Sequence, residues 1–192
     1  AVEMAHWDRD ISATLIHRGH HRTKTGMFVA FSHHLDVQNI RERDIDDREL
    51  QVIIIDATVQ RIPMRLIASH GPVKADWKLK QLHYDGILRN LKRIVREDEG
   101  MAQQNQEQPT RRLGVWAADH NMVCDRVNDE IQGTVGGKKK GEHAKLVDTI
   151  QKIEQILQIA DAYRTIHGAE TREYTHGKRR IDRISTEYAQ ET

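Results

Sequence analysis

Residues 113–121 read LGVWAADHN, and this stretch decides how the rest of the chain is interpreted. Its first six residues, 113–118, are mainly apolar, which predicts a buried strand. Asp119 and Asn121 follow directly, so two polar side chains stand where the strand ends. One interpretation is a loop-entry turn in which both side chains bond nearby backbone groups, as Asp and Asn commonly do. The other interpretation is a functional site at the end of a sheet.

Strand signals precede this stretch. The apolar run 27–31 is bounded by Gly26 and by polar residues, which suits a buried strand. Residues 50–55 are rich in β-branched side chains, and residues 61–68 follow after a polar interval, so the two runs are expected to pair as a hairpin. Pro63 removes a ladder donor, which places it at a strand start or on an edge.

A helical signal lies between the hairpin and residue 113. Apolar residues recur at spacings of three and four from about residue 76 to residue 97, with Asp76 as the expected cap. Residues 100–110 are Gln-rich and contain Pro109, which predicts a loop.

Downstream, residues 133–141 hold four glycines together with Lys138, Lys139 and Lys140, the composition of a flexible loop. An amphipathic helix is predicted from His143 to about Arg164, and residues 174–184 read as a loop that leads into a last strand. Strands that alternate with helices predict an α/β layered domain. We expect an irregular lead-in over residues 1–25 and one domain over residues 26–192.

The charge balance limits the binding partners. Thirty Lys and Arg residues against 29 Asp and Glu residues leave a net charge of +1, so no global field attracts nucleic acid or an anionic membrane. Nucleic-acid contacts would come from local patches such as Lys138–Lys140, whose simpler interpretation is a solvated loop. The 12 His residues make the chain more cationic in mild acid.

Cysteine usage and hydropathy bear on the compartment. Cys124 is the only cysteine, so no internal disulfide forms, and the cytosol or nucleus is the expected compartment. No apolar run approaches the roughly 20 residues that span a bilayer, and we expect no membrane partner. The chain begins at Ala1, which is compatible with processing or with a fragment.

Two histidine pairs, His20–His21 and His33–His34, suggest metal ligands at first sight. Adjacent residues of a strand point to opposite faces, however, so neither pair is expected to hold one ion.

The string of residues 116–121 resembles the Gly-Asp-Phe-Asn signature of the endonuclease/exonuclease/phosphatase superfamily, with Ala118 in place of the glycine and His120 in place of the aromatic residue. Residues 69–72 are similar to the superfamily's turn of tyrosine, any residue and proline. Segments 161–164, 172–175 and 180–184 resemble a series typical of retroelement endonucleases. The resemblance covers residues 26–188 and implies a layered β-sandwich flanked by helices, present in part.

The resemblance also implies chemistry. In this superfamily a divalent metal, usually Mg²⁺, binds the scissile phosphate and helps water to attack it. Asp119 would orient or deprotonate that water, and Asn121 would hold a phosphate oxygen or belong to the metal shell. Asp182 would orient a catalytic histidine, although an ion pair with Arg180 or Arg183 is the simpler interpretation. His70 stands at the position of a phosphate-contacting tyrosine.

Departures from the superfamily pattern predict an incomplete active site. The Gln-Glu pair with the main metal ligand would lie before residue 1, and the final Ser-Asp-His would lie beyond Thr192. Val73 stands where an asparagine is usual.

Three functions follow from these observations. The first is a Mg²⁺-dependent phosphodiesterase that acts on nucleic acid, and the second is a catalytically inactive domesticated module that packs against a partner chain. A weaker third is a phosphatase for small phosphoesters. Missing edge elements would expose strand edges and apolar surface, so self-association or a protein partner is expected.

Overall fold

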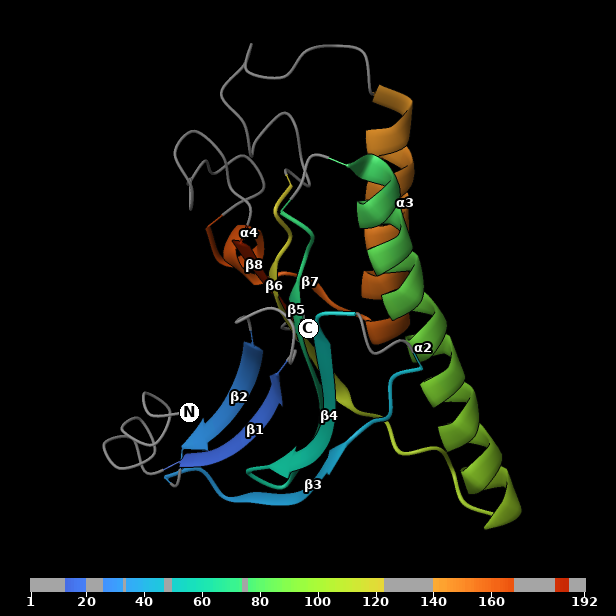
Figure 1. The fold of residues 1–192 in the computed structure, drawn as a ribbon. Coiled ribbons are helices and arrows are strands. Elements are labelled where there is room, and N and C mark those ends of the chain that lie inside the picture. The colour runs from blue at the N-terminus through green and yellow to red at the C-terminus, as the bar shows by residue number, and fades with distance from the viewer. Residues whose placement is uncertain are drawn as a thin grey trace.

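The computed structural model describes residues 13–19, 26–32, 34–46, 50–73, 76–122, 140–167 and 182–186. They form a layered α/β domain in which the two longest helices cover one face of a large sheet and a strand pair lies across the other face (Figure 1). The elements are β1 (Ala13–Gly19), β2 (Gly26–Ser32), β3 (Val37–Glu42), β4 (Val52–Val59), β5 (Ile62–His70), α2 (Trp77–Gln104), β6 (Leu113–Asp119), α3 (Lys140–Leu157), β7 (Ala160–Asp161), α4 (Ala162–His167) and β8 (Asp182–Thr186).

The large sheet has the strand order β3-β4-β5-β6-β8-β7. The predicted hairpin is confirmed as the antiparallel pair β4–β5, and both strands run further than expected, to Val59 and His70. Pro63 is the second residue of β5, at the strand start as predicted. β5 and β6 are parallel, and α2 makes the connection between them. The carboxyl ends of β5 and β6 therefore meet at one edge of the sheet.

Helix α2 begins as predicted and ends later. The Asp76 side chain accepts hydrogen bonds from the backbone N–H groups of Lys78 and Leu79. The helix continues to Gln104, so the prediction of a loop from residue 100 was wrong for its first five residues. A Cβ added at Gly100 would meet no other part of the protein within 4 Å, and the four residues after it are good helix formers, of which Ala102 is buried.

Helix α3 also differs from its prediction. It begins at Lys140 rather than His143, and it ends at Leu157 rather than near Arg164. Gln158 adopts a positive φ of 55°, which ends the helix and leads into β7 and the short helix α4. The sequence does not reveal this break, because the residues after Leu157 remain partly apolar and continue the apolar stripe of the helix.

Three strands were missed, namely β1, β3 and the two-residue β7. Residues 13–19 form β1, which pairs with β2 in antiparallel register, so the irregular lead-in expected over residues 1–25 was wrong there. β3 carries a bulge between Gln38 and Arg41, where Asn39 has a φ of 53°. Such a bulge interrupts the alternation of side chains by which a strand is identified.

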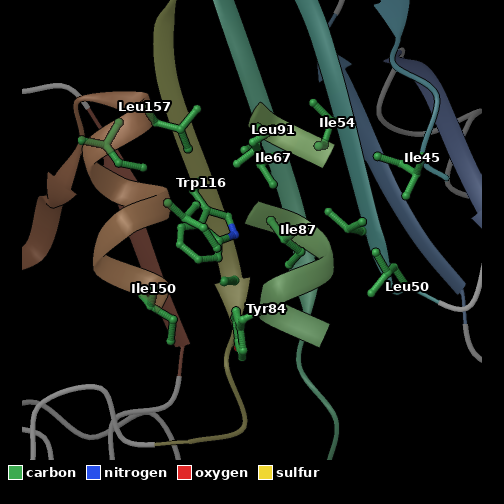
Figure 2. Packing of buried hydrophobic residues seen from close by; sticks show 14 of the residues in the cluster. Ile45, Leu50, Ile54, Ile67, Tyr84, Ile87, Leu91, Trp116, Ile150 and Leu157 are labelled. Atoms are coloured by element: carbon green, nitrogen blue, oxygen red, sulfur yellow. The ribbon is translucent and has the colours of Figure 1, made fainter. Parts of the chain in front are cut away.

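The main core lies between the large sheet and helices α2 and α3. Figure 2 shows Trp116 of β6 and Tyr84 of α2 packed among the aliphatic side chains of the same cluster, including Ile67, Ile87 and Ile150. A second cluster, built on Phe31, Ile53, Ile55 and Ala57, joins β2 to the opposite face of the sheet. The two clusters explain why the layers hold together.

A buried charge network joins α2 to the sheet. Arg65 donates to Asp56 at 2.7 Å and to Asp98 of α2 at 2.7 Å, and Arg43 donates to the same two carboxylates. Burial alone would raise the pKa of Asp98, but the hydrogen bonds from Arg65 and Arg43 outweigh it and hold this pKa below its ordinary value.

Among the described residues, no helix is long and apolar enough to cross a membrane.

Candidate functional site

Residues far apart in the sequence meet in one row at the end of the large sheet. The parallel register pairs His70 of β5 with Asp119 of β6, and the antiparallel register pairs Asp119 with Asp182 of β8. Gln51, one residue before β4, lies beside His70 and accepts its backbone N–H at 3.0 Å. Four side chains thus stand across four neighbouring strands, and we call Gln51, His70, Asp119 and Asp182 the end row.

The end row belongs to the face of the sheet that β2 packs on. Trp116 and Ala118 of β6 point into the core beneath the helices, so Asp119, the next residue of β6, points to the opposite face. His70 and Asp182 share that face, because residues directly paired across strands point the same way. The side chains of His70 and Asp119 are 36% and 32% exposed, which leaves them accessible to a substrate.

The turn after β6 holds Asn121 in place from three directions. Its backbone N–H donates to Oδ1 of Asp119 at 2.8 Å, and its carbonyl oxygen accepts from Nζ of the buried Lys80. Its side-chain Nδ2 donates to the carbonyl oxygen of Gly71 at 2.7 Å. These contacts fix a residue with a φ of 48°, a conformation that asparagine tolerates better than most residues. Asp119 and Asn121 therefore form the hydrogen bonds of an Asx turn. These bonds leave Oδ2 of Asp119 and Oδ1 of Asn121 available to contact a ligand.

His70 connects the end row to this turn. Its Nδ1 lies 2.7 Å from Oε1 of Gln51, and its Nε2 lies 3.3 Å from Nδ2 of Asn121. The same Nε2 is 3.6 Å from Oδ2 of Asp119. The imidazole therefore stands between an amide on one side and the two polar side chains of the turn on the other.

The floor of the site is packed without spare room. A Cβ on Gly71 would come within 2.5 Å of the carbonyl oxygen of His120 and within 2.9 Å of the Tyr84 hydroxyl, so only glycine fits. The Tyr84 hydroxyl lies 2.9 Å from Nδ1 of the buried His120, whose ring packs edge-on against Trp116. His120 thus occupies an aromatic position, consistent with its place in the Gly-Asp-Phe-Asn resemblance.

Asp182 begins β8 and is exposed, directly opposite Asp119. Its neighbour Arg183 pairs with Glu154 at 3.0 Å and with Asp161 at 3.2 Å. Arg180 lies outside the described residues.

Asp119 of the end row and the neighbouring Asn121 offer oxygen atoms of the kind that bind Mg²⁺. Among the residues that the structure describes, no three His, Cys, Asp or Glu side chains converge in a way that could hold a metal ion. The available donors are hard oxygens, Oδ2 of Asp119 and Oδ1 of Asn121. Mg²⁺ commonly binds through one or two carboxylates and keeps several waters. Asp119 and Asn121 would be the residues to hold such a cation, which would polarise the phosphoryl oxygens of a substrate.

Several residues that the sequence singled out lie outside the described part of the chain, namely Lys138, Lys139, His20, His21, His33 and Cys124. Lys140 starts α3, so the backbone there is helix rather than loop. Val73, at the usual asparagine position, is 72% exposed.

Gln51 and Lys80 were not predicted as site residues. Lys80 had a detectable signal, because it falls on the buried stripe of α2 with Tyr84, Ile87 and Leu91, where a charged side chain needs a partner. Gln51 had no such signal, since its place beside His70 depends on a strand pairing that the sequence does not reveal.

Comparisons with known proteins give similarity in structure only. No protein-family model matches the sequence, and no curated protein matches it. An AP endonuclease from Archaeoglobus fulgidus is similar with a TM-score of 0.58 and 15% identity, over 93% of this chain and 68% of that one. A humanized TDP2 of D. rerio has a TM-score of 0.53 and 13% identity over 100% of this chain and 68% of its own.

The catalytic domain of human Nocturnin, solved with a bound sulfate anion, has a TM-score of 0.52 and 12% identity, over 91% of this chain and 59% of that one. All three have the endonuclease/exonuclease/phosphatase fold, so the expected fold class is confirmed for this chain. The narrower resemblance to retroelement endonucleases stays a prediction.

Proposed function

We propose that this chain carries a nuclease-derived domain that cleaves phosphodiester bonds in nucleic acid with the help of Mg²⁺. The observation that carries the proposal is the end row, in which His70, Asp119 and Asp182 meet beside Asn121 at the exposed end of the sheet. Three strands far apart in sequence supply these side chains, and none of the three side chains is needed to fill the core. Polar groups gathered at a strand end in this way favour a site over a structural role.

Asp119 has the central role in the proposed reaction. Its Oδ1 is engaged by the N–H of Asn121, which holds the carboxylate in one orientation and leaves Oδ2 to accept a proton from, or to orient, an attacking water. Mg²⁺, when bound, would polarise the phosphoryl oxygens and neutralise their charge. Asp182, directly opposite Asp119, would add a second negative charge near such a cation. His70 and Asn121 complete the rim on which a phosphate would lie.

Nucleic acid is the proposed substrate class because an AP endonuclease shares the fold and because the end row is open to a large ligand. With a net charge of +1, attraction to the backbone has to come from local groups. Lys138, Lys139 and Lys140 remain the proposed phosphate contacts, since lysine side chains suit contacts that do not depend on base sequence.

A second candidate is a catalytically inactive module that binds a partner chain. The observation that favours it is that the described residues contain no convergent group of three metal-ligating side chains. In that case the end row would be an inherited feature, and the domain would act through its surface.

The two candidates are separated by a cleavage assay with supercoiled DNA and with RNA in the presence of Mg²⁺. The wild-type chain is compared with Asp119→Ala and with Asp148→Ala, a control that removes an exposed carboxylate of α3 paired with Lys152. We expect Asp119→Ala to lower the rate roughly 10²–10⁴-fold, the usual contribution of a general acid or base, and the control to leave it unchanged.

Equal and background-level products from wild type and Asp119→Ala would refute the enzyme and favour the binding module. A parallel assay with p-nitrophenyl phosphate tests the phosphatase alternative. Hydrolysis of that small ester without cleavage of nucleic acid would reassign the substrate class.

A further inference from the structure

A lysine lies in the buried stripe of α2. Lys80 shares this stripe with Tyr84, Ile87 and Leu91, and only 4% of its surface is exposed. An ammonium group taken out of water is unfavourable unless polar groups of the protein receive it. One such group belongs to the functional site, because Nζ of Lys80 donates to the carbonyl oxygen of Asn121.

The carbonyl group of Asn121 depends on this contact. Among the described residues, Lys80 is the only one that donates to it. The backbone N–H and the side chain of Asn121 bind Asp119 and Gly71, which lie at the ends of β6 and β5. Those two contacts fix Asn121 relative to the strand ends, whereas Lys80 fixes it relative to α2.

The same face of α2 contacts the residue before Asn121. Tyr84 lies one helical turn after Lys80, and residues four apart share a face of a helix. The Tyr84 hydroxyl lies 3.3 Å from the carbonyl oxygen of His120. Two successive carbonyl groups of the turn are therefore contacted from α2. The contact with Lys80 is the stronger kind, because hydrogen bonds that involve an ionised group are roughly twice as strong as neutral ones.

The direction of the Asn121 carbonyl group is linked to the backbone conformation of this residue. Asn121 has a φ of 48°, in the left-handed region, where a residue other than glycine stays only if its surroundings hold it. This region is small, so φ and ψ are restricted together. The ψ angle sets the direction of the carbonyl group, and a donor bound to its oxygen therefore also holds φ. In this conformation the N–H of Asn121 reaches Oδ1 of Asp119 at 2.8 Å.

We infer that Lys80 is a positioning residue of the proposed site, whose ammonium group holds Asn121 in its left-handed conformation and thereby keeps the Asp119 carboxylate in one orientation. Lys80 acts through the main chain of the turn and is not a phosphate contact. Its side chain is buried and comes from α2, on the face of the sheet opposite to the one to which Asp119 points. The role of Lys80 in the turn is independent of activity, and its meaning for catalysis rests on the proposed function.

Hydrogen exchange of the Asn121 amide, followed by NMR, tests the role in the turn, because this N–H is the donor to Asp119. Lys80→Met, similar in length but without a donor, should exchange this amide roughly tenfold faster or more, the change expected when a hydrogen bond to a charged group is lost. Lys80→Arg keeps a charged donor and should restore the protection. Lys92→Met changes an exposed lysine of the same helix and should have no effect.

The amide of Leu91, in the buried middle of α2, separates a local effect from a global one. Its exchange should be nearly unchanged in Lys80→Met, because methionine avoids the desolvation of a buried ammonium group and this offsets the lost hydrogen bond. If Lys80→Met does not fold, Lys80→Gln takes its place, since its amide is uncharged and one atom too short for the carbonyl oxygen. The same local loss of protection at Asn121 is expected.

Cleavage kinetics test the meaning for catalysis. With supercoiled DNA and saturating Mg²⁺, Lys80→Met should lower kcat on the order of 10²-fold, the usual cost of a misplacement by about 1 Å. KM should stay nearly unchanged, because Lys80 does not touch the substrate. Lys80→Arg should recover most of the lost kcat. A raised KM with an unchanged kcat in Lys80→Met would overturn the inference and make Lys80 a phosphate contact.

The exchange data can overturn the inference by themselves. Wild-type protection of Asn121 in Lys80→Met would show that the lysine is dispensable for the turn, and equal acceleration at Asn121 and Leu91 would show that it serves only the whole fold. A loosened Asn121 in Lys80→Met, without cleavage by the wild-type chain, would refute the proposed activity and leave the role in the turn intact. Cleavage that Lys80→Met retains in full would do the opposite.

Discussion

At Gly71 the backbone passes so close to the turn after β6 that a single methyl group has no room. The nearest atoms would be the carbonyl oxygen of His120 and the hydroxyl of Tyr84, both fixed by the core. The carbonyl oxygen of Gly71 also orients Asn121. One glycine therefore couples the packing of the floor to the geometry of the site.

Gly71→Ala is expected to destabilise the domain by about 1–3 kcal/mol through overpacking and to shift the turn that carries Asp119 and Asn121. Gly100→Ala is the matched control, because no atom lies within 4 Å of its new Cβ and alanine favours the interior of α2 by up to about 1 kcal/mol. Urea denaturation of both variants measures the two effects. A Gly71→Ala chain as stable as wild type would show that the residues packed against Gly71 can move to make room for the methyl group.

Tyr84→Phe removes the hydroxyl that contacts Nδ1 and the carbonyl oxygen of His120. Because His120 is buried, its polar atoms lose these partners without gaining water, and we expect a loss of roughly 1–3 kcal/mol of stability. The test is the urea midpoint of the variant. An unchanged midpoint would mean that the Tyr84–His120 contact contributes little.

The sequence identified candidate site residues where a polar residue stands at a recognisable place, such as the end of a strand. Asp119 and Asn121 were identifiable because polar residues directly follow an apolar run, and Asp182 and His70 were identifiable only through the family resemblance. Gln51 could not be found, since its place beside His70 arises only from the backbone and side-chain bonds between these two residues in the folded sheet.

At the scale of elements, α2 is held to the sheet by charge as well as by apolar packing. Asp98 near its C-terminal end receives Arg43, Arg65 and Arg112, which reach it from the β3–β4 connection, from β5 and from the start of β6. Asp98 and Arg65 are largely shielded from water. The network therefore fixes the last turns of the helix, which lie beyond the end that the apolar period predicted.

The network predicts a specific pH dependence. Since folding lowers the pKa of Asp98 below its ordinary value of 3.8, its contribution to stability is present above about pH 3.8 and is lost as the pH falls through the lower pKa of the folded state. Asp98→Asn should destabilise the chain at neutral pH by less than the roughly 3–5 kcal/mol typical of a broken buried pair, because Asp56 still neutralises the arginines.

The measurement is the free energy of unfolding of wild type and Asp98→Asn from neutral pH to about pH 2.5. The difference between them should shrink only below about pH 3.8. A difference that stays constant down to the lowest pH would contradict the assigned role of Asp98. Asp148→Asn, which alters an exposed pair, should differ from wild type by at most about 1 kcal/mol throughout.

Element boundaries show what the sequence could and could not predict. The Asp76 cap and the β4–β5 hairpin were predictable from local chemistry, because a capping carboxylate and β-branched runs act over a few residues. The end of α3 at Leu157 was not, because a positive φ at Gln158 replaces the glycine that usually marks such a stop.

At the scale of the whole molecule, the two faces of the sheet are covered unequally. α2 and α3 cover one face, whereas the β1–β2 pair lies on the other, where β2 contacts β4 and β5 (Figure 1). Over β6 and β8 the side chain of Ile184 is 59% exposed, and its register partner Ala117 is exposed as well. Ile166 of α4 is 67% exposed. Ile184 and Ala117 are exposed side by side, and adjoining apolar residues at the surface favour association.

We therefore expect the chain to self-associate or to bind a protein partner through this face, and Ile184→Thr to weaken that association while keeping a β-branched residue in β8. Sedimentation equilibrium over a range of concentrations measures it for the wild type and the variant. A sharp monomer for the wild-type chain, with a cooperative melt, would contradict the expectation of self-association.

The most direct test of the proposed activity is the rate of phosphodiester cleavage of supercoiled DNA and RNA as a function of Mg²⁺ concentration, for wild type and Asp119→Ala. The end row predicts a rate that rises with Mg²⁺ and saturates in the wild-type chain, and that falls roughly 10²–10⁴-fold when Asp119 is removed. A rate that does not depend on Mg²⁺, or one that Asp119→Ala retains in full, would contradict it.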